Sequence, residues 1–326
     1  MVPKKVRKFA ESSLKTRSLR WFRNPKPGFK NTAYFVENDG QRYTLKSSTV
    51  ADGGTEKRTE YSILRLLKSD SIPKPVAYDI QKNMLMKTYL EGRGKARFTA
   101  KDLQEAGKEL AKLHRMRFRK PGKPGMKRTP SNYKQYFNQQ ISILQSRISE
   151  LTQDERTRRL GNYLSTALTQ AVKEERNRTA RFSGNDFVVI NFDLIPKNIL
   201  WKGGKPLVID WGDASIGDPA LEISRIFFTL DFTKSQEQAL LNAYNSKDPN
   251  FLHRIQTYER FLAINRIVFD STMYHSLTSG RIKSVNNVNP RTFEKRFIEH
   301  YADYARKYLP GGTTAQAARD ILRSSL

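Results

Sequence analysis

The segment 191–219 reads NFDLIPKNILWKGGKPLVIDWGDASIGDP, and two short apolar runs in it are separated by Gly203-Gly204. Paired glycines between such runs predict a tight β-hairpin, because glycine adopts the backbone angles of a hairpin turn at little cost. In an antiparallel hairpin, the first residue of one strand lies beside the last residue of the other. We therefore expect strands at 199–201 and 206–209, with their outer ends side by side.

Polar side chains gather at the open end of this predicted hairpin. Asn198 and Asp210 are almost equally far from the turn, and Asp193 precedes Asn198 by five residues in a loop that contains proline. The sequence thus brings two carboxylates and one amide oxygen to one place. Hard oxygen ligands of this kind suit Mg²⁺ that is bound together with nucleotide phosphates.

The first 91 residues have the pattern of a small β-rich unit. Asp39-Gly40 between two β-branched and aromatic runs is a strong hairpin signal. Apolar residues at helical spacing within 51–69 predict a helix behind an acidic first turn. Strands are expected at 18–23, 33–37 and 41–46. The segment 72–80 is expected to lead to a further strand pair, which closes with 84–90.

Residues from about Thr99 onward have mainly helical patterns. An amphipathic stripe runs from Leu103 to Leu113 and ends at His114. Further helices are expected as a pair between 133 and 178, and at 258–274 and 292–308. The predicted fold class is α+β, with a small β-rich N-terminal lobe over 1–91 and a larger helical lobe over 92–326.

The spacing Asp-x4-Asn, followed by an Asp at a strand end, resembles the catalytic and metal loops of the protein-kinase-like fold. More narrowly, FDLIPKNIL and VIDWGDASIGDPALEIS are similar to aminoglycoside phosphotransferases and choline kinase-like small-molecule kinases. Members of that family typically read HGDLHPGNIL and then IDWxxAxxGDPxxDLA. The resemblance implies a two-lobed kinase-like fold and Mg²⁺-dependent transfer of a γ-phosphate from ATP or GTP to a hydroxyl of a small-molecule acceptor.

The resemblance also implies a role for each residue of the constellation. Asp193 would orient the acceptor hydroxyl and take its proton, while Asn198 and Asp210 would hold Mg²⁺. Lys46 ends the strand QRYTLK and would position the nucleotide phosphates. Glu60, on the following helix, would hold Lys46 in place.

Two further segments resemble nucleotide-binding parts of the family. Asn31 lies in PGFKNT, at the position of the turn that covers the nucleotide. Lys87 and Tyr89 lie in MKTYLEG, which resembles the hinge whose backbone would bind the adenine. Lys197, close to Asp193 in the loop, would add positive charge near the γ-phosphate.

The sequence departs from the family pattern on the acceptor side of the loop. Asn191 stands where the family has His, a residue that supports the loop by hydrogen bonding, and an Asn side chain can donate one similar bond. These changes argue against assuming an aminoglycoside acceptor. The other departures are Phe192, Ile195, Lys197 and Glu222.

Several other polar residues have structural interpretations. Asp218 precedes Pro219 and is expected to cap a helix, and Asp213 is either a support of the site or a loop cap. His114 is expected to be an architectural residue at a helix end. The remaining histidines form no zinc ligand set in the sequence; they are His253, His275 and His300.

The balance of charge constrains the partners. Fifty-nine lysines and arginines against 32 acidic residues give a net charge of +27, with a dense basic loop over 114–131. This excess favours phosphorylated or polyanionic partners, although a generally basic surface is an equally simple explanation. A neutral, zwitterionic or anionic acceptor fits better than a polycation.

Two other functions stay open beside the kinase. One is a nucleotide-binding regulatory protein, and the other is a kinase-like module that binds nucleic acid or an anionic surface, which is not the favoured reading. The absence of cysteine excludes disulfides and thiolate sites. With no apolar run that suits a signal peptide or a membrane span, we expect a soluble, cytoplasmic protein.

Overall fold

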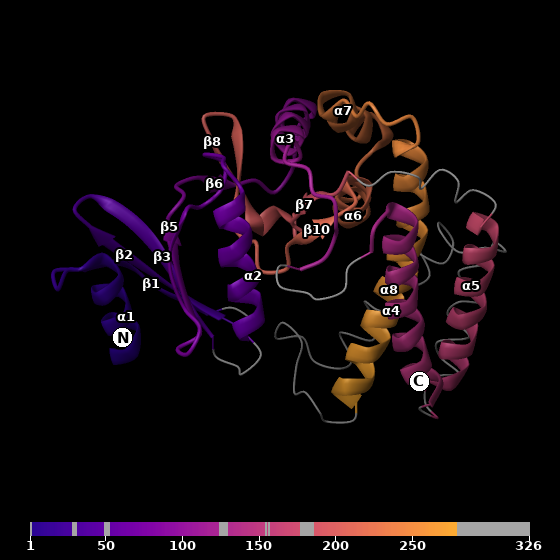
Figure 1. The fold of residues 1–326 in the computed structure, drawn as a ribbon, viewed down its shortest axis with the longest axis horizontal. Helices are drawn as coiled ribbons and strands as arrows, with labels where there is room; N and C mark the ends of the chain where they lie inside the picture. The colour runs from indigo at the N-terminus through magenta and orange to yellow at the C-terminus, as the bar shows by residue number, and fades with distance from the viewer. Residues whose placement is uncertain are drawn as a thin grey trace. The chain divides into compact units, whose positions relative to one another are not determined.

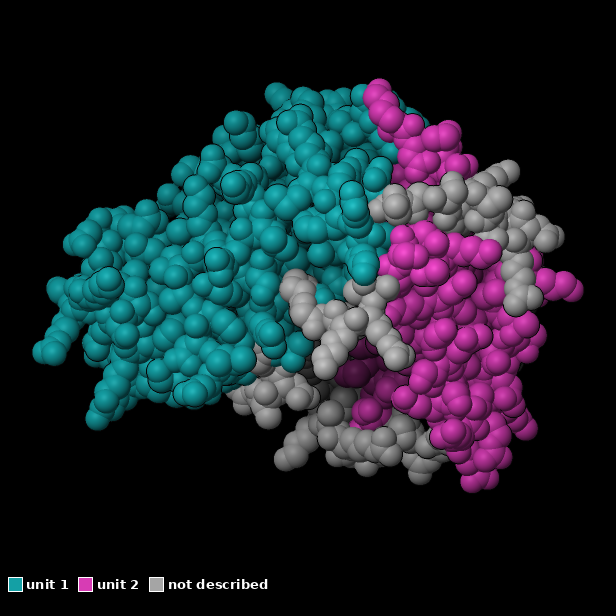
Figure 2. All heavy atoms as spheres, viewed as in Figure 1, with its two compact units in different colours: residues 1–129, 186–222, 229–246 teal, residues 130–185, 223–228, 247–326 magenta. Residues whose placement is uncertain are grey.

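The computed structural model describes residues 2–27, 31–48, 53–123, 130–153, 155, 157–176 and 186–278. The chain divides into two compact units, which Figure 2 distinguishes by colour. The first comprises 1–129, 186–222 and 229–246, and the second comprises 130–185, 223–228 and 247–326. The lobe boundary expected after residue 91 is not tested by this division and stays a prediction.

The N-terminal part of the first unit is an antiparallel sheet of five strands in the order β1-β2-β3-β5-β4. Asn38 pairs with Gln41 across the Asp39-Gly40 turn, and both turn residues have positive φ, as the hairpin prediction requires. The strands are β1 (Arg20–Pro27), β2 (Asn31–Asn38), β3 (Gln41–Ser48), β4 (Pro75–Asp79) and β5 (Met84–Thr88).

Two helices cover opposite faces of this sheet. The apolar side of α1 (Lys4–Leu14) packs on Leu45 and Met86, and α2 (Gly53–Leu66) binds the side chains of their neighbours Lys46 and Lys87. Successive residues of a strand point to opposite faces, so α1 and α2 lie on either side, as Figure 1 shows. Helix α1 was not expected from the sequence.

The predicted hairpin is present as β8 (Ile199–Lys202) and β9 (Lys205–Val208), joined by two glycines with positive φ. The short strand β6 (Arg93–Gly94) extends it to three strands. Strands β7 (Val188–Ile190) and β10 (Ser215–Gly217) form a separate antiparallel pair directly before and after the hairpin region. The 3₁₀ turn η2 (Pro196–Asn198) leads into β8.

The helices of the first unit include α3 (Ala100–Leu113) and α7 (Lys234–Tyr244), which pack against each other. Each begins with a capping box, from Thr99 and Thr233 respectively. Helix α6 (Pro219–Leu230) follows Asp218, whose carboxylate accepts from the backbone N–H of Ala220 at 2.9 Å. The capping role expected for Asp218 is therefore confirmed.

The second unit contains α4 (Tyr133–Gln153), α5 (Arg158–Arg176) and α8 (Phe251–Thr278). Helix α4 packs against both of the others, and its Phe137 meets Phe261 edge-to-face at 4.8 Å between ring centroids. The helix expected at 292–308 lies outside the described residues. Among the helices that the structure describes, none has the length and apolar character needed to cross a bilayer.

The contact between α3 and α7 depends on a glycine. A Cβ atom at Gly107 would lie 2.5 Å from the carbonyl oxygen of Leu240 and 3.0 Å from Cβ of Ala243. We expect Gly107→Ala to lower the free energy of unfolding by about 1–3 kcal/mol, because the two helix backbones must separate. Gly94→Ala is the matched control, since its Cβ would meet nothing within 4 Å. Equal denaturation midpoints for the two variants would contradict this prediction.

Candidate active site

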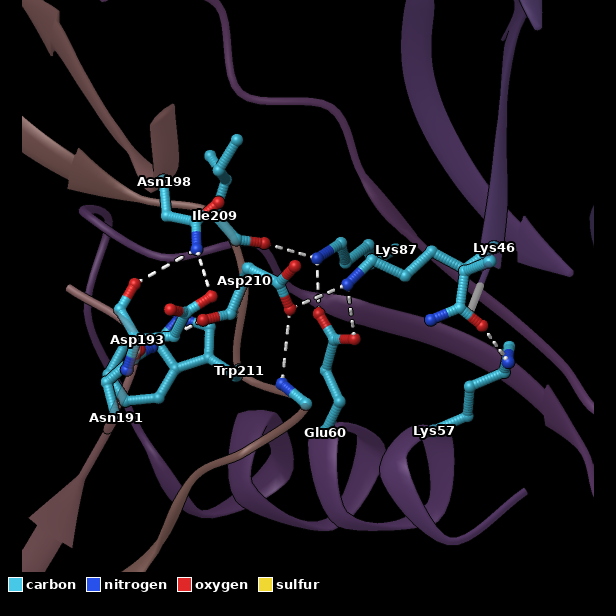
Figure 3. A network of polar contacts seen from close by, with 12 residues as sticks. Lys46, Lys57, Glu60, Lys87, Asn191, Asp193, Asn198, Ile209, Asp210 and Trp211 are labelled. Atoms are coloured by element: carbon cyan, nitrogen blue, oxygen red, sulfur yellow. Dashed lines mark hydrogen bonds and ion pairs between the residues drawn. The ribbon is translucent and has the colours of Figure 1, made fainter. Parts of the chain in front are cut away.

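The open end of the hairpin gathers the polar residues predicted from the sequence (Figure 3). The backbone N–H of Ile209 donates to the carbonyl of Asn198 at 3.1 Å, which fixes the two strand ends side by side. The amide nitrogen of Asn198 donates to a carboxylate oxygen of Asp193 at 2.7 Å and to its carbonyl at 2.9 Å. The predicted grouping of Asp193, Asn198 and Asp210 is therefore present in the structure.

Asp210 is bound to the sheet by a lysine. Its Oδ1 accepts from Lys46 Nζ at 2.9 Å and from the backbone N–H of Gly212 at 3.2 Å. Desolvation favours a higher pKa of the Asp210 carboxyl, but the charges of Lys46 and Lys87 outweigh it and hold this pKa well below its usual range. Asp210 is therefore a carboxylate at any physiological pH.

Lys46 binds two carboxylates at once. Besides Asp210, its ammonium group donates to Oε2 of Glu60 on α2 at 2.8 Å. Burial alone would lower the pKa of Lys46, yet the charges of Glu60 and Asp210 raise it above its ordinary value. The pairing of Lys46 with Glu60, expected only from the resemblance, is present.

The side chain of Lys87 has an unexpected position. It is 3% exposed and lies on the face of the sheet that α2 covers. There it donates to Oε1 of Glu60 and to the carbonyl of Ile209 (Figure 3). Burial lowers the pKa of Lys87, although Glu60 opposes the shift. Glu60, itself 1% exposed, thus has one lysine on each carboxylate oxygen. Sequence reasoning placed Lys87 in the hinge and gave no signal for this side-chain contact.

The hinge residue Tyr89 follows β5. Its backbone N–H donates to the carbonyl of Arg42 at 2.9 Å, so this N–H is used within the protein. Its ring meets Phe22 and Phe35 edge-on, and the guanidinium group of Arg23 lies 5.3 Å from its centroid. The binding of adenine by this segment stays a prediction.

Asn191 supports the loop over 191–198 from two sides. Its side-chain nitrogen donates to the carbonyl of Asp210, and its Oδ1 accepts from the backbone N–H of Asp193 at 2.9 Å (Figure 3). The amide therefore provides the hydrogen bond anticipated for this position and a second one. Phe192 has φ 65, a left-handed conformation that favours glycine, which explains why the family pattern has Gly there.

A buried chain of hydrogen bonds extends from this loop to α3 and α7. Oε1 of Glu222 accepts from the backbone N–H of Asn191, and its Oε2 lies 2.7 Å from Nε2 of His114. Nδ1 of His114 lies 2.9 Å from the hydroxyl of Tyr244. His114 is 1% exposed and architectural, as expected, but sequence reasoning did not connect it with Glu222.

Asp193 differs electrostatically from Asp210. Burial raises the pKa of the Asp193 carboxyl, the charge of Asp210 adds to the shift, and the exposed Lys197 acts against it. The positive charge of Lys197 is therefore close enough to Asp193 to affect its pKa. Asp213, whose role the sequence left open, is exposed in the turn after Asp210.

The donor set fits a Mg²⁺ ion that is bound mainly through phosphates. The amide nitrogen of Asn198 is used by Asp193, and no protein donor in the described residues reaches its Oδ1 or the Oδ2 of Asp210. Two protein oxygens plus phosphate and water are typical for Mg²⁺. The described part of the chain contains no group of three or more His, Cys, Asp or Glu residues that would form an all-protein metal site.

One known protein family has a sequence pattern that most of this chain matches. The model of the phosphotransferase enzyme family matches residues 21–259. No curated protein matches the sequence significantly.

Solved structures with a similar fold include ADP-bound aminoglycoside phosphotransferase APH(2'')-Ib, with a TM-score of 0.60, 16% identity and coverage of 98% of this chain and 99% of that chain. The choline kinase LicA from Streptococcus pneumoniae has a TM-score of 0.59, 18% identity and coverage of 92% and 99%. The ternary complex of APH(2'')-IIa with streptomycin and ATP has a TM-score of 0.59, 14% identity and coverage of 98% and 99%. The α+β, protein-kinase-like fold predicted from the sequence is confirmed.

The chain from His114 through Glu222 generates a stability prediction. We expect Glu222→Ala to lower the free energy of unfolding by about 3 kcal/mol, because it leaves His114 and the N–H of Asn191 buried without their acceptor. Glu237→Ala, which breaks the exposed pair with Lys234, should cost less than about 1 kcal/mol. Chemical denaturation measures both values, and a loss for Glu222→Ala no larger than that of the control would contradict a supporting role.

Proposed function

The chain belongs to the phosphotransferase enzyme family, and we propose that it transfers the γ-phosphate of ATP to a hydroxyl group of a small molecule, with Mg²⁺ as cofactor. The observation that carries this proposal is the convergence of Asp193, Asn198 and Asp210 with the buried pair of Lys46 and Glu60. These are the groups that phosphoryl transfer uses for positioning and for electrostatic stabilisation.

Each residue has a chemically distinct task in this proposal. Asp193 accepts the proton of the attacking hydroxyl, and Asn198 holds the Asp193 carboxylate in place through its amide nitrogen. Lys46 binds phosphate oxygens, and Glu60 fixes its ammonium group. Lys197 contributes positive charge beside Asp193.

Asn198 and Asp210 are the residues that would hold Mg²⁺, each through one side-chain oxygen. When bound, this ion supplies charge neutralisation for the transferring phosphoryl group. The carbonyl of Asp210 is meanwhile tied to Asn191, and its Oδ1 to Lys46. The orientation of the Asp210 carboxylate is therefore set by the protein before any ligand arrives.

The acceptor belongs to a neutral, zwitterionic or anionic class of hydroxyl compound. A net charge of +27 produces a field that repels polycations and attracts nucleotides and anionic substrates. The solved structures of similar fold include a choline kinase and phosphotransferases with aminoglycosides, so a test panel should contain choline, aminoglycosides and anionic hydroxyl compounds.

The central test compares Asp193, in the loop before the β8–β9 hairpin, with Asp213, in the turn after it. We expect Asp193→Asn to lower kcat for the best acceptor by about 10³-fold, because the proton acceptor is lost while nucleotide binding remains. Asp213→Asn, at an exposed position, should retain activity within a factor of a few. Phosphate transfer with Mg²⁺-ATP across the acceptor panel measures both. If no acceptor stimulates transfer and Asp193→Asn equals the wild type, the proposal fails.

The position of Lys197 generates a prediction about pH dependence. A base must be deprotonated, so kcat/KM should rise with pH through the pKa of Asp193, which burial raises above its usual value. Lys197→Gln removes a charge that lowers this pKa, and the acidic limb of the profile should therefore move to higher pH. Lys202→Gln, exposed in the hairpin, is the matched control. If the pH profiles of the two variants coincide, the acidic limb does not report the ionisation of Asp193.

A further inference from the structure

A second lysine on α2 lies beside the pair of Lys46 and Glu60. Lys57 precedes Glu60 by three residues, so the two side chains share one face of the helix, about one turn apart (Figure 3). Lys57 is 1% exposed, and its ammonium group donates to Oδ1 of Asn31 and to the hydroxyl of Ser48. Neither the resemblance nor the proposed mechanism gives this lysine a task.

The partners of Lys57 lie on β2 and on β3, the strand that also carries Lys46. Asn31 and Ser48 are directly opposite each other in the β2–β3 ladder, and Ser48 follows Lys46 by two residues. Residues two apart in a strand share a face and are separated by about 7 Å. Ser48, and Asn31 opposite it, therefore lie next to Lys46 on the same face of the sheet. This is the face that would receive the phosphates.

The contacts of Asn31 determine the orientation of its amide. An ammonium group has donors only, so the atom of Asn31 that faces Lys57 must be the oxygen. The hydroxyl of Ser48 donates to the same oxygen at 3.1 Å. The nitrogen of the amide is consequently turned away from both, and within the described residues it donates to no protein acceptor.

From this geometry we propose that Lys57 is a positioning residue for nucleotide phosphates. It fixes Asn31 so that the amide nitrogen of Asn31 donates to a phosphate oxygen. It also adds a positive charge on the same face of the sheet as Lys46. The inference rests on the proposed function, because it assigns a second phosphate contact to the same nucleotide site. It concerns binding of the polyphosphate and not the chemical step.

Charge supports the same conclusion. Asn31 and Ser48 are neutral acceptors for Lys57, and burial lowers the pKa of Lys57 to about 8, with the charge of Lys46 adding to the shift. Glu56 and Glu60 oppose this shift without cancelling it. A phosphate group next to Asn31 would stabilise the charged form of Lys57, so nucleotide binding should be coupled to proton uptake near pH 8.

The first experiment titrates ADP and adenosine, by calorimetry, into wild type and Lys57→Met. The variant should bind ADP about 10-fold more weakly and adenosine equally well, because adenosine has no phosphate for Asn31 or Lys57. Arg58→Met, the exposed neighbour on α2, is the control and should leave both affinities unchanged. Equal ADP affinity of wild type and Lys57→Met overturns the inference.

Asn31→Asp provides a second variant of nearly identical shape. It retains an oxygen for Lys57 and Ser48 but replaces the outward amide nitrogen by an acceptor, so ADP affinity should fall at least as far as in Lys57→Met. Adenosine affinity should again be unchanged. If Lys57→Met fails to fold, this variant alone decides the matter, since undiminished ADP binding overturns the proposed contact.

Proton counting separates a positioning role from a merely structural one. Titration of ADP near pH 8 in buffers of different ionisation enthalpy should show proton uptake in the wild type and none in Lys57→Met. Uptake that persists in the variant contradicts the role of Lys57. A wild type that binds neither ADP nor ATP would instead refute the proposed function, so the two failures are distinguishable.

Discussion

The ion pairs of the Glu60 carboxylate are the interactions on which the α2-covered side of the sheet depends. The carboxylate accepts from Lys46 on one oxygen and from Lys87 on the other, and so joins α2 to β3 and β5. Lys87 continues to the carbonyl of Ile209, directly before Asp210. Burying two ammonium groups without such a partner would lower the free energy of unfolding by several kcal/mol for each group. The packing of α2 against the sheet, which brings Glu60 to both lysines, avoids this loss. The packing of α2 and the pairing of charges in the site therefore depend on each other.

The loop over 191–198 has a separate support, in which Asn191 stands where the family pattern has His. Asn191 ties the backbone of Asp210 to that of Asp193, and Glu222 ties Asn191 to the buried His114. An amide both donates and accepts hydrogen bonds without titrating, so the loop geometry here does not depend on the protonation of residue 191. In this chain, the Asn191 side chain links the backbone of both aspartates.

Local spacing was sufficient to predict the hairpin and the grouping of Asp193, Asn198 and Asp210, because strand pairing and turn chemistry act over a few residues. The contacts of Lys57 and Lys87 were not predictable in that way. The contacts of Lys87 depend on β5 becoming the neighbour of β3, and those of Lys57 depend on where α2 packs against the β2–β3 hairpin. No short-range pattern encodes either arrangement. Helix α1 was missed for a related reason, since its few apolar residues gain burial only against the finished sheet.

The large positive charge of the chain and the charge of the site have different physical roles. Exposed residues of α1 such as Lys4, Lys5 and Lys8 lie on the opposite side of the sheet from α2 and cannot contact a nucleotide bound beside Lys46. Their field still acts at long range, where it accelerates the approach of anions and weakens with salt. Within the site, Glu60 and Asp210 balance the charges of Lys46 and Lys87, so the proposed binding of phosphate would depend on placed donors as well as on total charge.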